Sequence, residues 1–339
     1  MIINEFPSRE ITINNEKYLY FGGTSYLGMA SNKEFQTTIF EGLKKWGTFY
    51  GSSRSANIKL AIYDEVENYF SNFLETEASV TISSGTLAGK MVIDSLSKSP
   101  KKFFHYPKTH PAVLHANSLP LFINEKLNPL LQNTISEEIV ITADAILALE
   151  TEPTTFEFLN SISSQKKITL VVDESHSLGI IGNDGKGIFS SIDSTRLKRK
   201  ILISSLGKAL GLSGGIIASD KKFIDYIKAQ TLFVSSSGSN PAYLEAFLKS
   251  KELYKKQRKL LFDNLEFLAR ILKPNNHFYF NKKYPVIYST SDILHEKLLL
   301  NKIIIARFKY PTYENYMNRI VITANHTKDD LEKLTKTIN

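Results

Sequence analysis

The chain has 339 residues, 42% of them hydrophobic, and no cysteine. This length and composition exclude a disordered or fibrous protein, and the lack of cysteine excludes disulfides, thiol nucleophiles and cysteine-ligated zinc. The net charge of +8 is uneven: residues 1–240 carry 24 basic and 24 acidic side chains, whereas residues 241–339 carry 18 and 10. This excess indicates either a C-terminal unit that meets an acidic ligand or a solvated basic helix at 251–260.

The opening residues, MIINEFPSRE, contain no apolar segment behind a basic one, so we expect a cytoplasmic protein. Every apolar stretch is shorter than the roughly 18 to 20 residues of a membrane span, so no membrane association is expected. No zinc-finger spacing and no RRM-like strand points to a nucleic-acid partner. The histidines at 105, 110 and 115 are five residues apart, a spacing that one helix face does not gather, so we expect no metal.

Strand-like and helix-length segments alternate over the first 240 residues. The strand-like runs are residues 78–83, 137–142, 146–150, 166–173 and 199–205, and the clearest helix runs from Thr86 to about Leu96. Continuously apolar strands that end in a polar residue are typical of a parallel sheet covered by helices on both faces. The sequence therefore predicts an α/β fold, with ligands beyond the carboxyl ends of the strands, near Asp173 and after Ser205.

After about residue 240 the pattern changes. It predicts a long amphipathic helix at about 241–272, and then short strands with a helix between them and a final helix, at 277–281, 284–289, 302–307, 319–324 and 328–336. This is typical of a smaller α+β domain. We therefore expect an N-terminal arm (1–35), a large α/β domain (36–240) and a small C-terminal domain (241–339).

The densest chemical signal is SSLGKALGLSGGIIAS at 204–219, in which glycines flank Lys208. Glycines allow close approach of the backbone to a ligand. A lysine confined among apolar and glycine neighbours has a lowered pKa, which makes its amine usable for a Schiff base. The alternative is a phosphate-binding or surface lysine in a loop.

Three further features favour a functional lysine. Asp173 ends its strand 35 residues earlier, where a carboxylate can hold a pyridine nitrogen. Ser84, Gly85 and Thr86 begin a helix, whose free amide groups and dipole favour an anion such as phosphate. His110 follows a strand-like run, where an imidazole can stack on a flat ring. Each has a simpler explanation, as a helix cap, a turn or a structural histidine.

In this order the motifs resemble a known family. The segments that match it are SYLGMASN (25–32), YGSSRSAN (50–57), SSGTLAG (83–89), VVDESHSLGIIGNDGKG (171–187), the Lys208 segment and PTYENYMNRIVITANHTKDDL (311–331). They are similar to the α-oxoamine synthases of the fold-type I PLP-dependent enzymes, which include 8-amino-7-oxononanoate synthase and 2-amino-3-ketobutyrate CoA ligase. The resemblance implies a mostly parallel central sheet between helices, with a smaller C-terminal α+β domain.

The resemblance also implies roles for individual residues. Lys208 would bind pyridoxal 5'-phosphate (PLP) covalently and move protons, Asp173 would pair with the pyridine nitrogen, and His110 would stack on the ring. His176 and Ser175 would lie near the ring hydroxyl. The phosphate would contact Ser84, Gly85, Thr86 and Ser205, and from the neighbouring subunit Ser235 and Ser236. Substrate would meet Glu150, Lys309 and Arg319. A homodimer with shared active sites follows from the resemblance.

Some positions depart from the family pattern. Thr86 replaces an aromatic residue, Tyr63 a histidine and Lys309 an arginine, and of an expected Arg-Leu-Arg only Arg319 is present. Exchanging arginine for lysine at a carboxylate site loses the bidentate contact. These changes affect the prediction of substrate more than the prediction of cofactor.

The implied reaction joins an amino acid to an acyl thioester of coenzyme A or a carrier protein, with loss of carbon dioxide, to give an α-amino ketone. An aminotransferase would use the same lysine and aspartate. GLSGG (211–215) matches the serine hydrolase pattern around Ser213, but a strand pattern follows it where that motif requires a helix. A protein that keeps the fold without catalysis is the remaining alternative.

Overall fold

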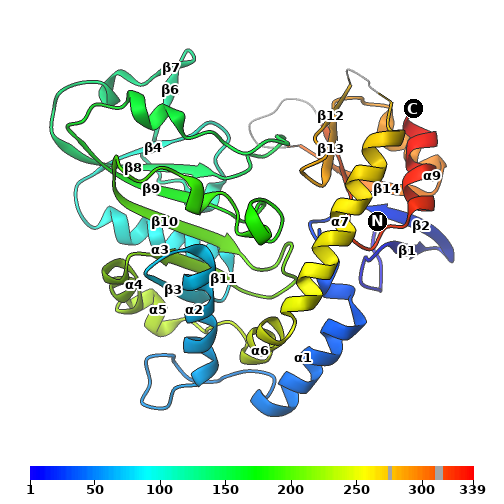
Figure 1. The fold of residues 1–339 in the computed structure, drawn as a ribbon, viewed down its shortest axis with the longest axis horizontal. Helices are drawn as coiled ribbons and strands as arrows, with labels where there is room; N and C mark the ends of the chain where they lie inside the picture. Colours follow the sequence, from blue (N-terminus) through cyan, green and yellow to red (C-terminus); the bar gives the residue numbers. More distant parts are fainter. Residues whose placement is uncertain (274–276, 310–315) are drawn as a thin grey trace.

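The computed structural model describes residues 1–273, 277–309 and 316–339. Its strands form a seven-stranded sheet, a six-stranded sheet and a small hairpin (Figure 1). The seven-stranded sheet has the order β3–β11–β10–β9–β8–β4–β5. Its strands are β3 (Ala78–Ile82), β4 (Lys102–His105), β5 (Leu119–Pro120), β8 (Glu137–Asp144), β9 (Lys166–Asp173), β10 (Leu197–Ser205) and β11 (Gly215–Ser219), and the hairpin is β6 (Phe122–Ile123) with β7 (Lys126–Leu127).

The large sheet is mostly parallel, as predicted. Strands β10, β9, β8, β4 and β5 run parallel to one another, whereas β11 runs antiparallel to both β10 and β3. Side chains that alternate along β9 enter two different apolar cores: Leu170 and Val172 pack on one face, and Val171 on the other. A sheet covered on both faces explains why its central strands are continuously apolar.

Helices cover both faces of this sheet. Helices α3 (Gly85–Ser97), α4 (Lys221–Lys228) and α5 (Thr231–Ser235) pack on the face that includes Val171. The other face packs against α2 (Ala61–Leu74), α6 (Pro241–Lys249) and α7 (Lys251–Ile271), with α1 (Lys33–Trp46) beside α6. The observed α3 confirms the helix that was predicted to begin near Thr86.

Two predicted elements are wrong. Residues 146–150 form turns after β8 and no strand, because Leu149 has a left-handed backbone (φ 70°) and the amide of Glu150 bonds back to the carbonyl of Leu147. The single helix predicted at 241–272 is two helices, α6 and α7. They meet at Ser250, whose backbone leaves the helical conformation at φ −103° and ψ 21°.

The second sheet joins the two ends of the chain. Its order is β1–β2–β14–β15–β13–β12. The strands are β1 (Glu10–Ile13), β2 (Glu16–Phe21), β12 (Phe278–Phe280), β13 (Val286–Ser289), β14 (Ile303–Phe308) and β15 (Met317–Val321), accompanied by α8 (Leu294–Leu300) and α9 (Lys328–Ile338). Since β2 pairs with β14 in parallel, the N-terminal arm is part of the C-terminal sheet. We propose that the arm and residues 241–339 form one structural unit beside the large domain.

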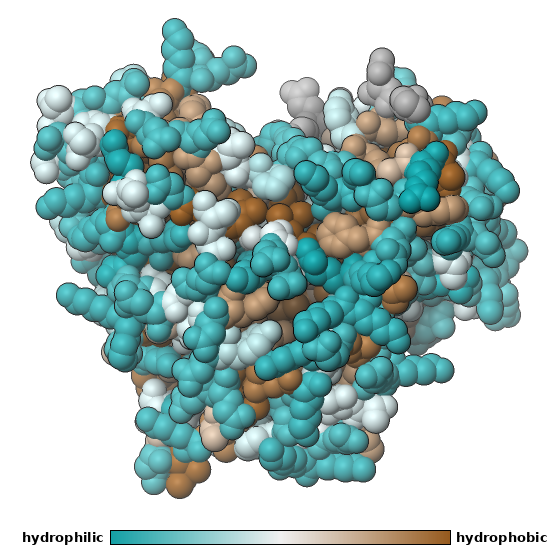
Figure 2. All heavy atoms as spheres, in the orientation of Figure 1, coloured by the Kyte–Doolittle hydropathy of each residue, from teal (hydrophilic) through white to brown (hydrophobic). Residues whose placement is uncertain are grey.

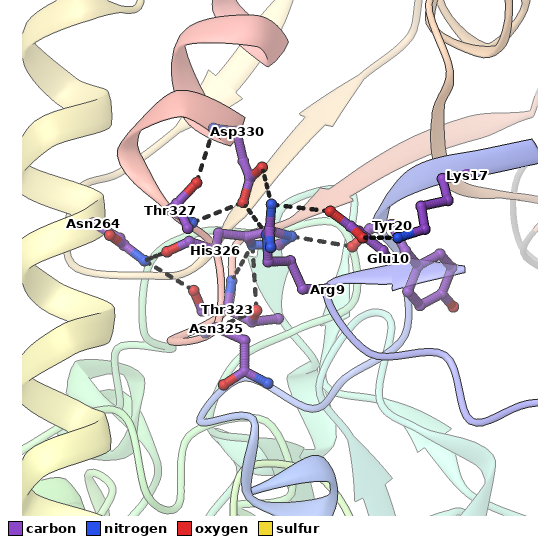
Figure 3. A network of polar contacts seen from close by, with 10 residues as sticks. All are labelled: Arg9, Glu10, Lys17, Tyr20, Asn264, Thr323, Asn325, His326, Thr327 and Asp330. Atoms are coloured by element: carbon purple, nitrogen blue, oxygen red, sulfur yellow. Dashed lines mark hydrogen bonds and ion pairs between the residues drawn. The ribbon is translucent and has the colours of Figure 1, made fainter. Parts of the chain in front are cut away.

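A polar network ties the N-terminal strands to α9 (Figure 3). The Nε atom of Arg9 lies 2.7 Å from Oδ2 of the buried Asp330. His326 stacks on Phe21 at 4.0 Å between ring centroids, and its Nδ1 accepts the amide proton of Thr323 at 2.9 Å. The other ring nitrogen therefore carries the proton, which it donates to the carbonyl of Tyr20 at 3.1 Å. The neutral imidazole is thus fully hydrogen-bonded.

This network predicts acid destabilisation. Burial lowers the pKa of His326 from 6.5 to about 4. A lowered pKa in the folded state means that the unfolded chain binds more protons, so stability is lost as pH falls from 6.5 towards 4. The loss amounts to about 3 kcal/mol at pH 4. Urea unfolding of the wild type and His326→Gln should give free energies whose difference shrinks by this amount between pH 7 and 4. Parallel pH profiles would show that folding leaves the pKa of His326 unchanged and would contradict this prediction.

One face of the molecule is hollowed between its two parts. Figure 2 shows a notch between the large sheet and the C-terminal sheet, with hydrophobic side chains at its base and hydrophilic ones around it.

Across residues 1–273, 277–309 and 316–339, every helix is too short or too polar to cross a membrane.

Candidate active site

A cavity of about 280 Å³ opens where β8, β9 and β10 end. It is lined by Ser83, Ser84, Gly85, Thr86, His110, Ala112, Asp144, Asp173, Ser175, His176, Ser205, Gly207, Lys208, Leu212, Ser213 and Gly214. Nine of the residues predicted from the sequence are among them: Ser84, Gly85, Thr86, His110, Asp173, Ser175, His176, Ser205 and Lys208. The fold therefore brings together segments that lie more than 100 residues apart in the sequence.

Lys208 sits on a tight loop between β10 and β11. The loop is closed by backbone hydrogen bonds from Leu206 to Gly214 and from Leu212 back to Leu206. Gly211 is left-handed (φ 67°), and a side chain there would meet the backbone of Ala30 at 2.9 Å. The lysine is thus presented to the cavity by a fixed backbone, which limits where its amine can move.

The surroundings of Lys208 favour its neutral form. Burial lowers the pKa of Lys208, while the carboxyl groups of Asp173 and Asp144 act in the opposite direction and Arg319 adds to the lowering. No hydrogen bond or ion pair links its amine to the rest of the described chain. An amine of lowered pKa without a hydrogen-bond partner is suited to addition to a carbonyl.

Asp173 is oriented by its own strand end. Its Oδ1 accepts the amide proton of Ser175 at 2.8 Å, which fixes the carboxylate and leaves the second oxygen to face the cavity. The hydroxyl of Ser175 in turn accepts the amide proton of Ser205, also at 2.8 Å. These bonds connect the ends of β9 and β10, so a ligand held by Asp173 has a defined position relative to Lys208.

Asp144 is a site residue that the sequence analysis missed. It ends β8 directly beside Asp173 and is 6% exposed. Its Oδ1 accepts the amide proton of His110 at 3.1 Å. Burial, followed by the charge of Asp173, raises the pKa of Asp144 well above its usual value. The signal was available, because ITAD at 141–144 ends an apolar strand with an acid just as VVD at 171–173 does.

The part of the cavity lined by the start of α3 suits an anion. Ser84 caps α3 by accepting the amide proton of Leu87, and the helix begins at Gly85. The first amide groups of a helix have no partner within it, and the helix dipole favours negative charge there. A side chain at position 85 would lie 2.7 Å from Cα of Ser205, so glycine allows the helix end and β10 to meet.

Two histidines complete the lining. The Nδ1 atom of His110 accepts the amide proton of Ala112 at 3.2 Å, and burial lowers the pKa of His110. The Nδ1 atom of His176 lies 2.9 Å from the hydroxyl oxygen of Tyr26. Burial, with contributions from Lys208 and Arg319, lowers the pKa of His176 well below its usual value. Both rings are therefore neutral near pH 7.

The other predicted site residues lie outside this cavity. Glu150 forms an ion pair with Lys108 at 2.6 Å, and Lys309 is exposed. The hydroxyl groups of Ser235 and Ser236 bond to carbonyls of α5. Arg319 on β15 donates to the carbonyl of Gly23 at 2.9 Å, and its buried Nε has no partner within the described residues. The Pro-Thr pair at 311–312 lies outside the described residues.

Ser213 lines the cavity but lacks the geometry of a hydrolase nucleophile. It lies on the loop between two antiparallel strands, β10 and β11, whereas a nucleophile elbow joins a strand to a helix. A larger cavity of about 770 Å³ borders α7. It is lined mainly by aromatic and charged side chains and contains none of the predicted site residues, so the smaller cavity is the candidate active site.

Comparisons with known proteins agree with this site. The profile of the aminotransferase class I and II family matches residues 152–338. The chain belongs to this family. It is similar to a putative 8-amino-7-oxononanoate synthase from Methanococcus vannielii, with 28% identity over 352 residues, 98% of this chain and 94% of that protein.

Two solved structures have the same fold as this chain. Serine palmitoyltransferase from S. paucimobilis, solved with PLP and myriocin bound, has a TM-score of 0.86 at 17% identity and covers 99% of this chain and 90% of its own. 8-Amino-7-oxononanoate synthase from Francisella tularensis has a TM-score of 0.70 at 23% identity, covering 95% and 96%. The predicted resemblance, the fold-type I α/β class and the assignment as a PLP-dependent transferase are confirmed.

The cavity of this aminotransferase-family chain fits PLP in its chemistry. It contains an amine of lowered pKa, a carboxylate fixed by a backbone amide, and a helix N-terminus beside serine hydroxyls. These groups match the aldehyde, the pyridine nitrogen and the phosphate of PLP. The glycine at position 85 lets the start of α3 pack directly against Ser205, so the helix N-terminus and this serine lie together in the lining.

Proposed function

We propose that the chain is a PLP-dependent α-oxoamine synthase that condenses an amino acid with an acyl thioester, releasing carbon dioxide and giving an α-amino ketone. The observation that carries this is the meeting of Lys208, Asp173 and the α3 N-terminus in one cavity. Relatives named 8-amino-7-oxononanoate synthase that align with 95% or more of the chain support it.

When bound, PLP supplies an aldehyde for the amine and a ring that withdraws electrons from the α carbon of an amino acid. Lys208 would hold the aldehyde and, as a neutral amine, take and return the α proton. Asp173, with one oxygen bonded to the Ser175 amide, would hold the proton of the pyridine nitrogen with the other. Ser84, the first amides of α3 and Ser205 would bind the phosphate. His110 is neutral and would cover the ring face.

Substrate recognition is proposed from charge. The positive charge of Arg319 acts on the residues of the cavity, because it contributes to the lowered pKa values of both Lys208 and His176. Its unpartnered buried Nε is available for the carboxylate of the amino acid. Glu150 and Lys309 remain proposed substrate contacts. Ser235 is exposed, and we propose that it and the neighbouring Ser236 contact the PLP phosphate of the partner subunit in a cytoplasmic homodimer.

The test is a substrate screen that follows thiol release. Purified protein with PLP is mixed with single amino acids, each labelled at its carboxyl carbon, and with acyl groups on coenzyme A or a carrier protein. The chain contributes no thiol because it has no cysteine, so a thiol reagent reports only the acyl carrier. We expect one pair of substrates to release thiol and labelled carbon dioxide in equal amounts, and Lys208→Ala to release neither.

The alternatives give different results. Formation of a keto acid without thiol release would identify an aminotransferase, the activity that the family profile includes in its name. Failure of the protein to bind PLP at all would favour a non-catalytic member of the fold.

A further inference from the structure

Tyr26 lies in the SYLGMASN segment after β2 and contacts His176, one of the residues that line the cavity. Its side chain is fully buried, and its hydroxyl oxygen lies 2.9 Å from Nδ1 of His176. On its other side the hydroxyl of Tyr284 is 3.4 Å away, on the segment that leads into β13. The backbone carbonyl of Tyr26 accepts the amide proton of Ala324 at 2.9 Å. Tyr26 is therefore held by its hydroxyl contacts with His176 and Tyr284 and by its backbone bond to Ala324.

All three side chains in this row are neutral near pH 7. Burial lowers the pKa of His176 well below its usual value, so its ring carries a single proton. Burial raises the pKa of Tyr26 and raises that of Tyr284 well above the usual value, so both phenols keep their protons. The row is thus a chain of neutral hydrogen bonds, and the direction of its protons decides which nitrogen of His176 is protonated.

Two directions are open to such a chain. Either Tyr26 donates to Nδ1 of His176 and accepts from Tyr284, or Nδ1 donates to Tyr26 and Tyr26 donates to Tyr284. Tyr26 has one proton to donate in either direction, so the better acceptor decides between them. The contact of its hydroxyl with Nδ1 of His176, at 2.9 Å, is shorter than the 3.4 Å contact with Tyr284. The lone pair of a neutral imidazole nitrogen is also a stronger acceptor than a phenol oxygen, which selects the first direction.

We propose that Tyr26 is a positioning residue that donates its hydroxyl proton to Nδ1 of His176 and thereby fixes the ring proton on Nε2. His176 lines the cavity, and no group in the described part of the chain bonds to Nε2. The Nε2 proton is then available to an oxygen in the cavity. The identity of that oxygen as the ring hydroxyl of PLP rests on the proposed function, whereas the tautomer does not.

The tautomer is measured by long-range ¹H–¹⁵N NMR of the protein without PLP, labelled in histidine. His176→Asn identifies the signals of this residue among the seven histidines. We expect the wild type to show Nδ1 unprotonated and Nε2 protonated, and Tyr26→Phe to show exchange between both tautomers. Tyr284→Phe removes only the longer contact and should keep the wild-type tautomer. Protonated Nδ1 in the wild type, or an unchanged tautomer in Tyr26→Phe, overturns the proposal.

PLP binding gives a second readout. For histidines that bind metal ions, loss of the partner that orients the ring typically weakens binding 10- to 100-fold, and we take the lower end as the expectation for a histidine that meets PLP. We expect Tyr26→Phe to bind PLP about tenfold more weakly and to shift its absorbance, with thermal unfolding checked in parallel, and Tyr284→Phe to change affinity less than threefold. Equal affinities in Tyr26→Phe and the wild type count against the proposal. If the wild type binds no PLP, the proposed function fails while the NMR result still decides the tautomer.

Discussion

Lys208→Ala is expected to abolish the visible absorbance band of enzyme-bound PLP and to lower the rate of thiol release at least 10³-fold. The physical reason is that Lys208 provides the amine of lowered pKa in the cavity. Alanine leaves the loop backbone unchanged, because the bonds that close it run between main-chain atoms of its neighbours. Absorbance spectra and single-turnover assays measure both effects.

A matched control is Lys200. Burial also lowers the pKa of Lys200, but its amine donates to the carbonyls of Phe189 and Ile192, and it does not line the cavity. Lys200→Met should therefore keep the band and most of the activity. A normal band in Lys208→Ala, or its loss in both variants, would refute the assignment of the amine.

Asp173→Asn should lower activity by about 10² to 10³-fold, because an amide does not hold a proton on the pyridine nitrogen as a carboxylate does. The bound cofactor should also titrate at lower pH, since the stabilising negative charge is gone. A pH series of absorbance spectra and of the rate of thiol release checks both expectations.

The neighbouring carboxyl group offers the control for this change. Burial raises the pKa of Asp144 well above its usual value, which favours its uncharged form, and its Oδ1 accepts a backbone proton that asparagine can also accept. Asp144→Asn should therefore cost less than tenfold in activity. Equal losses in the two variants would contradict the separate role given to Asp173, and a larger loss in Asp144→Asn would reverse the two roles.

The sequence predicted the parts of the fold that depend on local patterns. Strands β9 and β10 are recognisable because burial on both sides demands continuous apolar residues, as in Leu170, Val171 and Val172. The pairing of β2 with β14 is not predictable in this way, since it joins segments almost 300 residues apart. The break at Ser250 carries no glycine or proline, so the residue types there do not indicate that the helix divides.

The same distinction, between local sequence patterns and long-range contacts, applies to the site. Lys208, Asp173 and the start of α3 have unusual neighbours in sequence, so their chemistry was visible. Tyr26 was not singled out, because an aromatic residue in an apolar segment normally indicates only the core, and its role depends on a contact with His176 across 150 positions. Contacts of this kind are set by the tertiary fold.

The central claim is a covalent bond between PLP and Lys208 beside Asp173. Borohydride reduction of the PLP-loaded protein, followed by proteolysis and mass spectrometry, makes that bond permanent and locates it. We predict one modified peptide, with the pyridoxyl phosphate group on Lys208, and no modification in Lys208→Ala. Modification of a different lysine, or none in a protein that retains bound PLP, would contradict the account.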